Sequence, residues 1–374
     1  MKRSNSKAMK NKTAFILNYA PHYRLFIYKK INDELNVDFY FGNIPNSSIK
    51  KLDYKNLSNF KEEFKTLKLL SFLWYKNSVR LIFKSYKNYI LTGDPYILSN
   101  WIILVLAKLF NKKTVLWTHG WYGRETITKK VVKKMYFGLA DKILLYNEKS
   151  KSLMLDEGFQ EKKLIPIYNS LDYDTQKVIR DGLQEKGIYF NYFKNNCPVL
   201  IYIGRIQKTK KIDLLLKSLY EFKLQNIIYN LIIVGGNSDE FNANEIIKNL
   251  EIEDQVWLYG PSYDEEKNAE LIFNANLCVS PGNVGLTAIH SLMYGTPVLT
   301  HNNFKNQGPE WECIIEGVNG GFFKENDVDD LMSKIKYYIQ HPINKEQCYK
   351  VIEEKWNPHN QINILKDVLN ESSN

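Results

Sequence analysis

Short apolar runs alternate with amphipathic stretches along the first half of the chain. A run at 13–19 leads through a polar turn into a helical stretch at 23–35, and a second run follows at 37–41. This β–loop–α–β order is the unit of a parallel sheet. The same alternation predicts further strands at 89–91, 114–117, 142–146 and 164–168, with helices at 96–110 and 128–139.

A second series follows the stretch 173–196, which is polar and aromatic without strong periodicity and is interpreted as the interdomain connection. The predicted strands are 199–203, 230–234, 256–259, 277–280 and 298–300, and the predicted helices are 212–221, 243–250, 265–274 and 287–294. Two consecutive series imply an α/β fold of two doubly wound, Rossmann-like domains that face each other across a cleft. We expect these domains at 1–190 and 191–355, and a C-terminal helix within 356–374 that packs back on the first domain.

The charge is unevenly distributed between the two halves. Residues 1–190 carry 34 Lys and Arg against 17 Asp and Glu, whereas residues 191–374 carry 17 against 24. A basic half suits nucleic acid, an anionic membrane surface or an acidic substrate. Nucleic acid is disfavoured because no recognised nucleic-acid-binding motif accompanies the charge.

The stretch 67–92 mixes large apolar residues with five Lys and Arg at apparent helical spacing. Such a helix suits an anionic membrane surface, and the alternative is a core-facing helix with solvated lysines. The longest uninterrupted apolar run, 101–107, is far shorter than the roughly 20 residues that span a bilayer. The basic N-terminus leads into no long apolar segment. We therefore expect a cytoplasmic protein that is peripheral at the inner face of the cell membrane.

Ligands of open parallel sheets bind beyond the carboxyl ends of the strands. Four predicted loops lie at such ends: 19–24, 118–124, 204–211 and 281–287. In the third loop, Arg205 ends a strand and Lys210 precedes a helix. Two fixed cations at the mouth of a sheet suit a diphosphate. The alternative is a solvated run of lysines at a helix start.

The fourth loop is rich in glycine. Gly282 and Gly285 allow a backbone to approach a ligand closely, and the helix predicted at 287–294 aims its first N–H groups at the loop. A helix start of this kind binds anions, although an ordinary strand-to-helix turn has the same pattern. No GxGxxG follows 13–19 and no GxxxxGK[ST] occurs, which disfavours a dinucleotide-dependent dehydrogenase and a P-loop phosphotransferase.

Two loops of the first half carry candidate histidines. His119 lies between a threonine and a glycine at a strand end, where it is well placed to accept or orient a hydroxyl proton. The alternative is a structural hydrogen bond. His22 and Arg24, after the first strand, form a second candidate pair. The four cysteines are too far apart in sequence for a zinc site.

Several segments of the second half match a known pattern in order and spacing. They are Tyr202-Ile203-Gly204-Arg205, Val234-Gly235-Gly236, Leu258-Tyr259-Gly260, Gly285-Leu286-Thr287-Ala288, Gly295-Thr296-Pro297-Val298 and Glu316-Gly317-Val318-Asn319-Gly320. On these segments the domain resembles the C-terminal domain of GT-B glycosyltransferases, in particular the retaining family 4 (glycosyl transferases group 1). The first half resembles the acceptor domain more loosely, at 19–24, at His119-Gly120 and at 169–172.

The resemblance implies a glycosyltransferase that takes a nucleotide sugar, expected to be a UDP-sugar, as co-substrate, without another cofactor and without a metal. We assign catalysis to His119, Arg205 and Lys210, and acceptor binding to His22, Arg24 and Arg124. Donor binding is assigned to Gly204, Tyr259, Gly260, Ser262, Asn283, Gly285, Leu286, Thr287, His290 and Glu310.

One departure from the family concerns a pair of glutamates, seven residues apart, across the fourth loop and its helix. The aligned positions here are Gly282 and His290. His290 retains a ring nitrogen that is able to hydrogen-bond a ribose hydroxyl. Gly282 has no carboxylate, so we expect Asn283 or Glu310 to recognise the sugar instead.

The sequence therefore predicts transfer of a sugar to a hydroxyl of a lipid-linked precursor of a bacterial surface polysaccharide or lipopolysaccharide. One alternative is a non-catalytic GT-B-like partner subunit of a glycan assembly complex, which the missing glutamates favour. Another is a membrane-surface or nucleic-acid binder that acts through its basic half.

Overall fold

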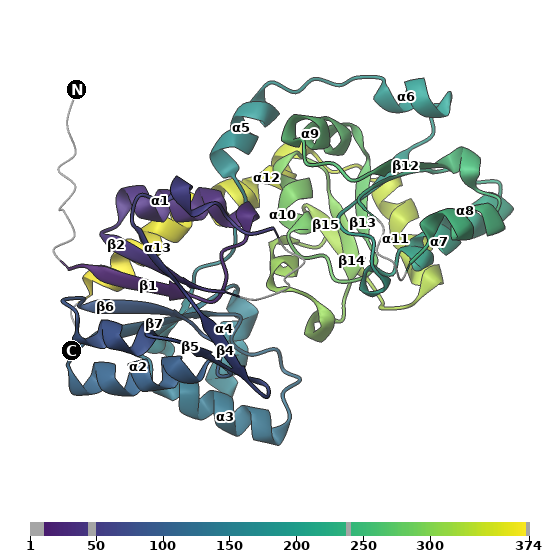
Figure 1. Ribbon diagram of the computed structural model, residues 1–374. Helices are drawn as coiled ribbons and strands as arrows, with labels where there is room; N and C mark the ends of the chain where they lie inside the picture. The colour runs from purple at the N-terminus through teal and green to yellow at the C-terminus, as the bar shows by residue number, and fades with distance from the viewer. Residues whose placement is uncertain (1–10, 44–49, 237–240, 372–374) are drawn as a thin grey trace. The chain divides into compact units, whose positions relative to one another are not determined.

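The computed structural model describes residues 11–43, 50–236 and 241–371, which form two compact units (Figure 1). The first unit holds the described residues up to Leu171 together with those from Pro358 onward, and the second runs from Asp172 to Asn357. This division lies earlier in the chain than the boundary expected between residues 190 and 191.

The first unit is built on a parallel sheet of seven strands in the order β3-β2-β1-β6-β7-β8-β9. The strands are β1 Thr13–Leu17, β2 Val37–Gly42, β3 Phe60–Phe64, β6 Asn88–Thr92, β7 Lys113–Thr118, β8 Lys142–Leu145 and β9 Leu164–Pro166. β1, β2 and β7 are buried along their whole length, as expected of parallel strands covered on both faces. β3 was not predicted because this edge strand has the polar sequence Phe-Lys-Glu-Glu-Phe.

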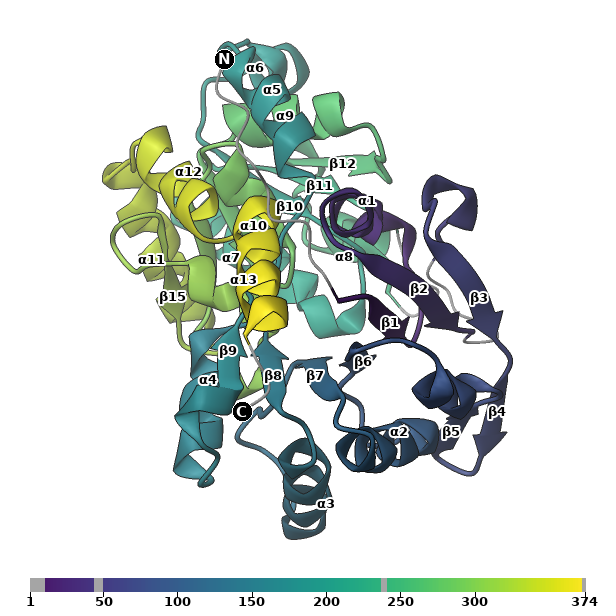
Figure 2. The same cartoon turned by 90° about the vertical axis from the view of Figure 1, so that its left-hand side faces the viewer.

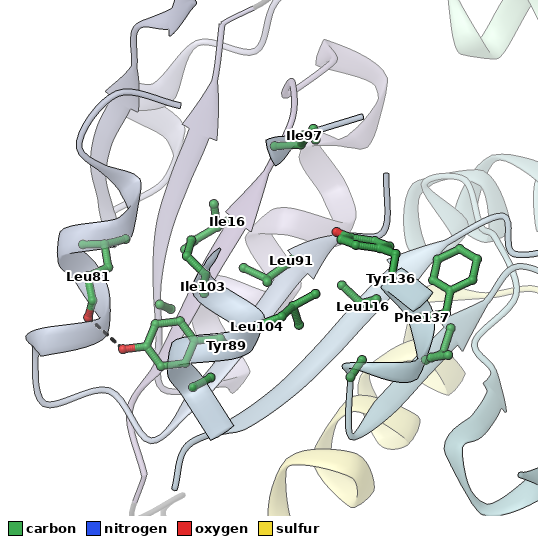
Figure 3. Packing of buried hydrophobic residues seen from close by; sticks show 14 of the residues in the cluster. Ile16, Leu81, Tyr89, Leu91, Ile97, Ile103, Leu104, Leu116, Tyr136 and Phe137 are labelled. Atoms are coloured by element: carbon green, nitrogen blue, oxygen red, sulfur yellow. Dashed lines mark hydrogen bonds between the residues drawn. The ribbon is translucent and has the colours of Figure 1, made fainter. Parts of the chain in front are cut away.

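Helices cover both faces of this sheet. On one face, α1 (Leu25–Glu34) and the C-terminal helix α13 (Pro358–Asn370) contribute to one core cluster. On the other face, α2 (Leu98–Leu109) and α3 (Ile127–Gly138) direct Leu104 and Phe137 into a second cluster (Figure 3). Burial of its apolar side is the main force that holds α13 on the first unit.

The stretch 67–92 is not a helix, so that prediction was wrong. β4 (Thr66–Leu69) and β5 (Phe72–Tyr75) form an antiparallel hairpin, and a 3₁₀ helix, η3 (Ser78–Phe83), leads into β6. Tyr75 is buried in the core cluster and Leu73 packs against it, whereas Phe72 is exposed. This burial of alternate residues follows the period of a strand.

The second unit contains a parallel sheet of six strands in the order β12-β11-β10-β13-β14-β15. Figure 2 labels β10, β11, β12 and β15 of this sheet. The strands are β10 Val199–Ile203, β11 Asn230–Val234, β12 Val256–Gly260, β13 Leu277–Ser280, β14 Val298–His301 and β15 Gly320–Phe323. The helices that follow β10 in this unit are α7 Ile212–Leu224, α8 Ala243–Asn249, α9 Glu265–Asn274, α10 Thr287–Met293, α11 Val328–Gln340 and α12 Lys345–Glu354. The observed strands and helices up to β14 agree in order with those predicted.

The supposed connection 173–196 is partly helical. α5 (Tyr173–Asp181) and α6 (Ile188–Phe193) both pack on α9 of the second unit. The Tyr189 hydroxyl of α6 donates to the Leu271 carbonyl oxygen over 2.6 Å. These helices are short, and tertiary contacts with α9 rather than their own apolar periodicity stabilise them.

Candidate functional site

Two loops of the second unit meet where its strand order reverses. β10 lies between β11 and β13, so the loop 204–211 after β10 and the loop 281–287 after β13 start side by side. Gly282 N–H donates to the Lys210 carbonyl oxygen over 3.0 Å, and Thr287 Oγ1 donates to the Ile203 carbonyl oxygen over 2.8 Å. Such a switch point is where open α/β sheets bind their ligands.

Gly282 is required by the close approach of the other loop. A Cβ atom at this position would overlap the Thr209 carbonyl oxygen and lie 2.7 Å from Lys210 Cα. The backbone at 209–210 therefore occupies the space that any side chain at 282 would need. This contact explains in physical terms why the position has no glutamate.

Lys210 and Arg205 supply two neighbouring cations beside this loop. Lys210 Nζ donates to the Asn283 carbonyl oxygen. Burial, assisted by the charge of Arg205, lowers the pKa of Lys210 to about 8, against the opposing effect of Glu310. The Arg205 side chain is exposed, and no described residue forms an ion pair or hydrogen bond with its guanidinium. The pair is thus able to neutralise an anionic ligand.

Neighbouring polar side chains hold the glycine-rich loop in place. Gln307 Oε1 accepts from Val284 N–H over 2.9 Å, while Gln307 Nε2 donates to Thr300 Oγ1 over 2.9 Å. Asn283 Nδ2 donates to the Asn306 carbonyl oxygen over 3.2 Å. Glu310 is buried and lies beside the same loop, because a Cβ at Gly308 would meet both Glu310 Oε2 and Asn283 Oδ1. The two side chains expected to recognise a sugar are therefore neighbours.

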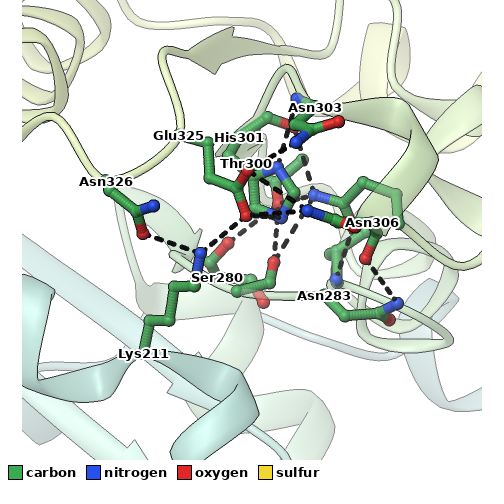
Figure 4. Close-up of polar contacts among 12 residues, drawn as sticks. Lys211, Ser280, Asn283, Thr300, His301, Asn303, Asn306, Glu325 and Asn326 are labelled. Atoms are coloured by element: carbon green, nitrogen blue, oxygen red, sulfur yellow. Dashed lines mark hydrogen bonds and ion pairs between the residues drawn. The ribbon is translucent and has the colours of Figure 1, made fainter.

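Lys211 has a structural role away from the glycine-rich loop. Its Nζ contacts Glu325 Oε1 at 2.6 Å and donates to Asn326 Oδ1 over 2.7 Å (Figure 4). Although burial opposes ionisation, hydrogen bonds from Lys211 and Asn303 lower the pKa of Glu325 to about 2. Of the three lysines 208, 210 and 211, only Lys210 hydrogen-bonds the glycine-rich loop within the described structure.

His290 of α10 points toward the start of α9. Its Nε2 lies 2.9 Å from Glu265 Oε1, which also accepts from the Tyr294 hydroxyl at 2.7 Å and from Gln176 Nε2 at 2.8 Å. Despite the opposing effect of burial, the charge and hydrogen bond of His290 lower the pKa of Glu265 to about 2. Sequence reasoning missed Glu265, because nothing in its local pattern indicates that α10 and α5 both reach it.

The remaining residues assigned to the donor lie around these loops. β12 ends at Tyr259 and Gly260, and Gly260 has a φ of 87° and a carbonyl oxygen that accepts from Gly235 N–H. The chain then passes Ser262, whose carbonyl oxygen accepts from Asn268, and reaches Glu265. Gly204, Gly285 and Leu286 belong to the two meeting loops, with φ 146° at Gly204 and 53° at Gly285.

The first unit has a separate cavity of about 560 Å³ beyond the carboxyl ends of β1, β6 and β7. β1 lies between β2 and β6, so this cavity also lies at a point where the strand order reverses. Its polar lining includes Tyr19, Arg24, Asp94, His119, Tyr122 and Lys133.

The loop that carries His119 is held by its own Glu125, by Lys133 of α3 and by Ser150 of α4 (Glu148–Asp156). Glu125 accepts from the N–H groups of Tyr122 and Gly123 over 2.9 Å each. Ser150 donates to the His119 carbonyl oxygen over 2.8 Å. Lys133 Nζ contacts Glu125 at 2.7 Å. The backbone around His119 is therefore fixed before any ligand binds.

The ring of His119 lies 4.6 Å from that of Tyr146, and the Arg24 guanidinium lies 5.3 Å from the centre of the same tyrosine ring. The His119 side chain is exposed at the mouth of the cavity. Partial desolvation by the protein groups around the ring, together with the positive charges of Arg24 and Lys133, lowers the pKa of His119 to about 4. At neutral pH the imidazole is therefore uncharged and able to accept a proton.

Asp94 lines this cavity, whereas His22 and Arg124 lie outside it. Asp94 was missed by sequence reasoning, although it follows β6 in a Gly-Asp-Pro turn, and burial raises its pKa. His22 does not line the cavity, and its Nδ1 instead lies 3.1 Å from the Lys50 carbonyl oxygen. Arg124 lines an adjoining cavity of about 620 Å³ that shares Tyr96 and Tyr122 with the first. The predicted pair of His22 and Arg24 is thus separated, since only Arg24 faces the cavity.

The chain is similar to known glycosyltransferases. Residues 189–355 match the family model described as glycosyl transferases group 1. A protein of Haemophilus influenzae described as an uncharacterized glycosyltransferase is 23% identical over 258 residues, which cover 67% of each chain.

Two solved structures share the fold. The structure of Anabaena HepE in complex with UDP has a TM-score of 0.71 at 14% identity and covers 96% of this chain and 99% of that protein. The lipopolysaccharide outer core galactosyltransferase WaaB, in its apo form, has a TM-score of 0.68 at 16% identity and covers 95% and 99%. The chain therefore has the α/β GT-B fold of two Rossmann-like domains, as predicted.

Proposed function

We propose that this protein is a glycosyltransferase that moves a sugar from a nucleoside-diphosphate donor to a hydroxyl of a glycan acceptor. The observation that carries the proposal is the pair of cations, Arg205 and Lys210, beside the glycine-rich loop at the switch point of the second unit. The family model, which covers this same unit, and the described relatives support glycosyltransferase activity.

The comparisons also favour a class of donor and a class of acceptor. HepE binds UDP in its solved structure, which supports a UDP-sugar as the donor. WaaB is described as a galactosyltransferase of the lipopolysaccharide outer core. We accordingly assign the acceptor to a lipid-linked precursor of a bacterial surface polysaccharide or lipopolysaccharide.

The chemistry assigned to the second unit is electrostatic. As the bond between the sugar and the diphosphate breaks, negative charge grows on the leaving phosphate. Arg205 and Lys210 stabilise this charge, and such stabilisation by fixed groups is usually the largest contribution to catalysis. Asn283 and Glu310 hold hydroxyls of the transferred sugar, the role of the family glutamate whose position is occupied here by Gly282. In this scheme no metal ion is needed.

The first unit supplies the acceptor site in this proposal. His119, uncharged at neutral pH, accepts the proton of the attacking hydroxyl or orients it. Arg24 and Arg124 bind the rest of the acceptor in the two adjoining cavities. Asp94 is a second proton acceptor in the same cavity, at a pKa raised by burial.

A donor panel tests the proposal. The purified protein is heated with each of several nucleotide sugars, and the cognate donor raises its melting temperature because it binds the folded state alone. Release of nucleoside diphosphate from that donor is then measured with and without a cell-extract acceptor. Stabilisation with acceptor-dependent release supports the enzyme.

A non-catalytic partner subunit is the second candidate, and the backbone contact at Gly282, which leaves no room for a carboxylate, favours it. In the same experiment this candidate predicts stabilisation by nucleotide without release under any acceptor condition. The two functions are therefore separated by one assay.

A further inference from the structure

The first unit combines a strongly basic segment with many large apolar side chains that face solvent. Residues 64–124 contain ten Lys and Arg but only one acidic residue, Asp94. Apolar side chains scattered singly on a surface are ordinary, but contiguous ones indicate an interaction surface. Whether this region is an interaction surface therefore depends on whether its exposed apolar side chains are contiguous.

α3 carries a continuous exposed apolar stripe. Ile127, Val131 and Met135 are spaced by four residues, so they lie on one side of the helix, and they are 83%, 52% and 62% exposed. Lysines 129, 130, 133 and 134 flank the stripe. Lys130 and Lys134 pair with Glu157, whereas Lys129 forms no ion pair among the described residues.

α2 carries a second stripe of the same kind. Ile102, Val105 and Leu109 are exposed, and the stripe continues into Phe110. The ring of Phe110 lies 5.6 Å from that of Phe83, which is itself 70% exposed. The neighbouring exposed cations are Lys84 and Lys108. An apolar band with lysines at its border is typical of segments that lie in a membrane interface.

The tip of the β4–β5 hairpin is apolar where polar residues are usual. Its two-residue turn consists of Leu70 and Ser71, and Leu70 has a φ of 55°. This left-handed conformation disfavours a leucine, and hairpin turns normally place asparagine or glycine there. Leu70 is nevertheless 85% exposed and Leu69 67% exposed. Exposure of such large apolar side chains to water is unfavourable in free energy, which indicates that the tip contacts an apolar partner.

These three features lie on one layer of the first unit. Tyr75 of β5 belongs to the same core cluster as Leu104 of α2 and Phe137 of α3. Figure 3 shows Leu104 and Phe137 in this cluster. The rings of Trp101 of α2 and Tyr136 of α3 lie 5.0 Å apart, so the two helices are neighbours. Their outward sides and the hairpin consequently form one surface, which we name the basic-apolar face.

We propose that the basic-apolar face docks on an anionic lipid bilayer, with the hairpin tip and both helical stripes at the level of the acyl chains nearest the headgroups. Charge complementarity selects this occupant: Lys84, Lys108 and Lys129 attract anionic headgroups, whereas a second copy of the chain would bring like charges together. No described helix is both long enough and apolar enough to cross a bilayer.

The face is also connected to the cavity assigned to the acceptor, and this part of the inference rests on the proposed function. The cavity of about 620 Å³ is lined by Phe72 of the hairpin and by Lys129 and Val132 of α3, and it shares Tyr96 and Tyr122 with the cavity of His119. A lipid-linked acceptor held in the membrane would thus enter the cavity directly from the docked face.

Flotation with vesicles tests the docking. Wild-type protein is mixed at low salt with phosphatidylcholine vesicles that contain either no phosphatidylglycerol or about a third of it. We expect binding to the anionic vesicles that is at least tenfold stronger and declines with salt. The substitutions Leu70→Asn and Ile127→Ser with Met135→Ser should reduce this binding about tenfold without unfolding, because all three side chains are exposed and asparagine suits a positive φ.

Tyr263→Ser is the matched control, since this side chain of the second unit is 90% exposed and should leave vesicle binding unchanged. The triple substitution of Lys84, Lys108 and Lys129 by Ser should remove the preference for anionic vesicles. The proposal is overturned if wild-type protein ignores anionic vesicles at low salt, if the apolar variant binds as wild type does, or if the face instead forms a dimer on size exclusion. Stabilisation by nucleotide is measured in the same samples, so that failure of the donor site and failure of docking are recorded separately.

Discussion

Glu265 and His290 join the start of α9 to the middle of α10 through a contact of 2.9 Å between Oε1 and Nε2. The same carboxylate oxygen also accepts from Tyr294 and Gln176, so three donors fix its position. No described residue bonds the other oxygen, Oε2. A carboxylate held in this way is able to offer one oxygen to a ligand hydroxyl without moving.

We predict that His290→Ala and Glu265→Gln each weaken UDP binding about 10- to 100-fold, because each removes a charged or charge-oriented hydrogen bond of the kind worth ~1.5–3 kcal/mol. Isothermal titration of free UDP measures the effect. His341→Ala is the control, since this exposed histidine of the second unit bonds only the Tyr337 carbonyl oxygen within the described structure. Normal UDP affinity with poor sugar transfer would show that His290 and Glu265 serve the sugar rather than the nucleotide.

Arg205→Ala and Lys210→Ala should each reduce kcat/KM by an amount equivalent to ~2–4 kcal/mol, because each removes a cation from the developing phosphate charge. Lys208→Ala is the matched control, since Lys208 is exposed on the same loop and bonds no described side chain. Initial rates of nucleotide release, with circular dichroism to verify folding, provide the measurement. Unchanged rates in both variants would contradict the assignment of the diphosphate to this loop.

The depressed pKa of Lys210 adds a pH dependence. With a pKa of about 8, Lys210 is charged below this pH and becomes neutral as the pH rises through it. We therefore expect kcat/KM to fall above about pH 8, and Lys210→Arg to retain more of its activity there, because a guanidinium does not titrate in this range. A decline in alkali that is identical in wild type and Lys210→Arg would assign the titration to another group.

Gly282→Ala is expected to destabilise the protein by roughly 1–3 kcal/mol, the usual cost of forcing extra atoms into a packed site. The new Cβ would overlap the Thr209 carbonyl oxygen and displace the loop that carries Lys210. Gly236→Ala is the matched control, because its Cβ would meet only Pro261 Cβ, at an ordinary 3.7 Å. Urea denaturation compares the two variants, and equal stability would mean that the two loops are not in close contact in solution.

His119→Ala should lower kcat/KM about 10²-fold and leave UDP affinity unchanged, as expected when a proton acceptor for the attacking hydroxyl is lost. His22→Ala is the control and should have no effect, because His22 does not line the cavity. Since the pKa of His119 is about 4, wild-type activity should remain on a plateau through pH 6.5 and decline only as the imidazole is protonated near pH 4. A decline centred near pH 6.5 would show that the pKa of His119 is not lowered by its surroundings.

The succession of most strands along the chain and the positions of the four candidate loops follow from the sequence alone. Parallel strands buried on both faces are continuous apolar runs, so β1, β7, β10 and β11 are recognisable without a structure. Because ligands gather at the carboxyl ends of such strands, the loops at 204–211 and 281–287 were also accessible from the pattern. Where burial is one-sided or the element is short, as in β3, the β4–β5 hairpin and α5, local periodicity was too weak or too brief to identify the element.

Only the tertiary structure decided which side chains within these loops meet. Glu265 lies far from His290 in sequence and becomes its partner because α9 and α10 are packed side by side. In the same way, the need for glycine at 282 comes from the backbone of another loop. The exposure of Leu70 comes from its position at a hairpin tip. The hydrophobic pattern determines which face of each element is buried, because burial dominates the free energy of folding. Contacts between polar groups at the ends of different elements depend on how those faces pack, and no local pattern encodes them.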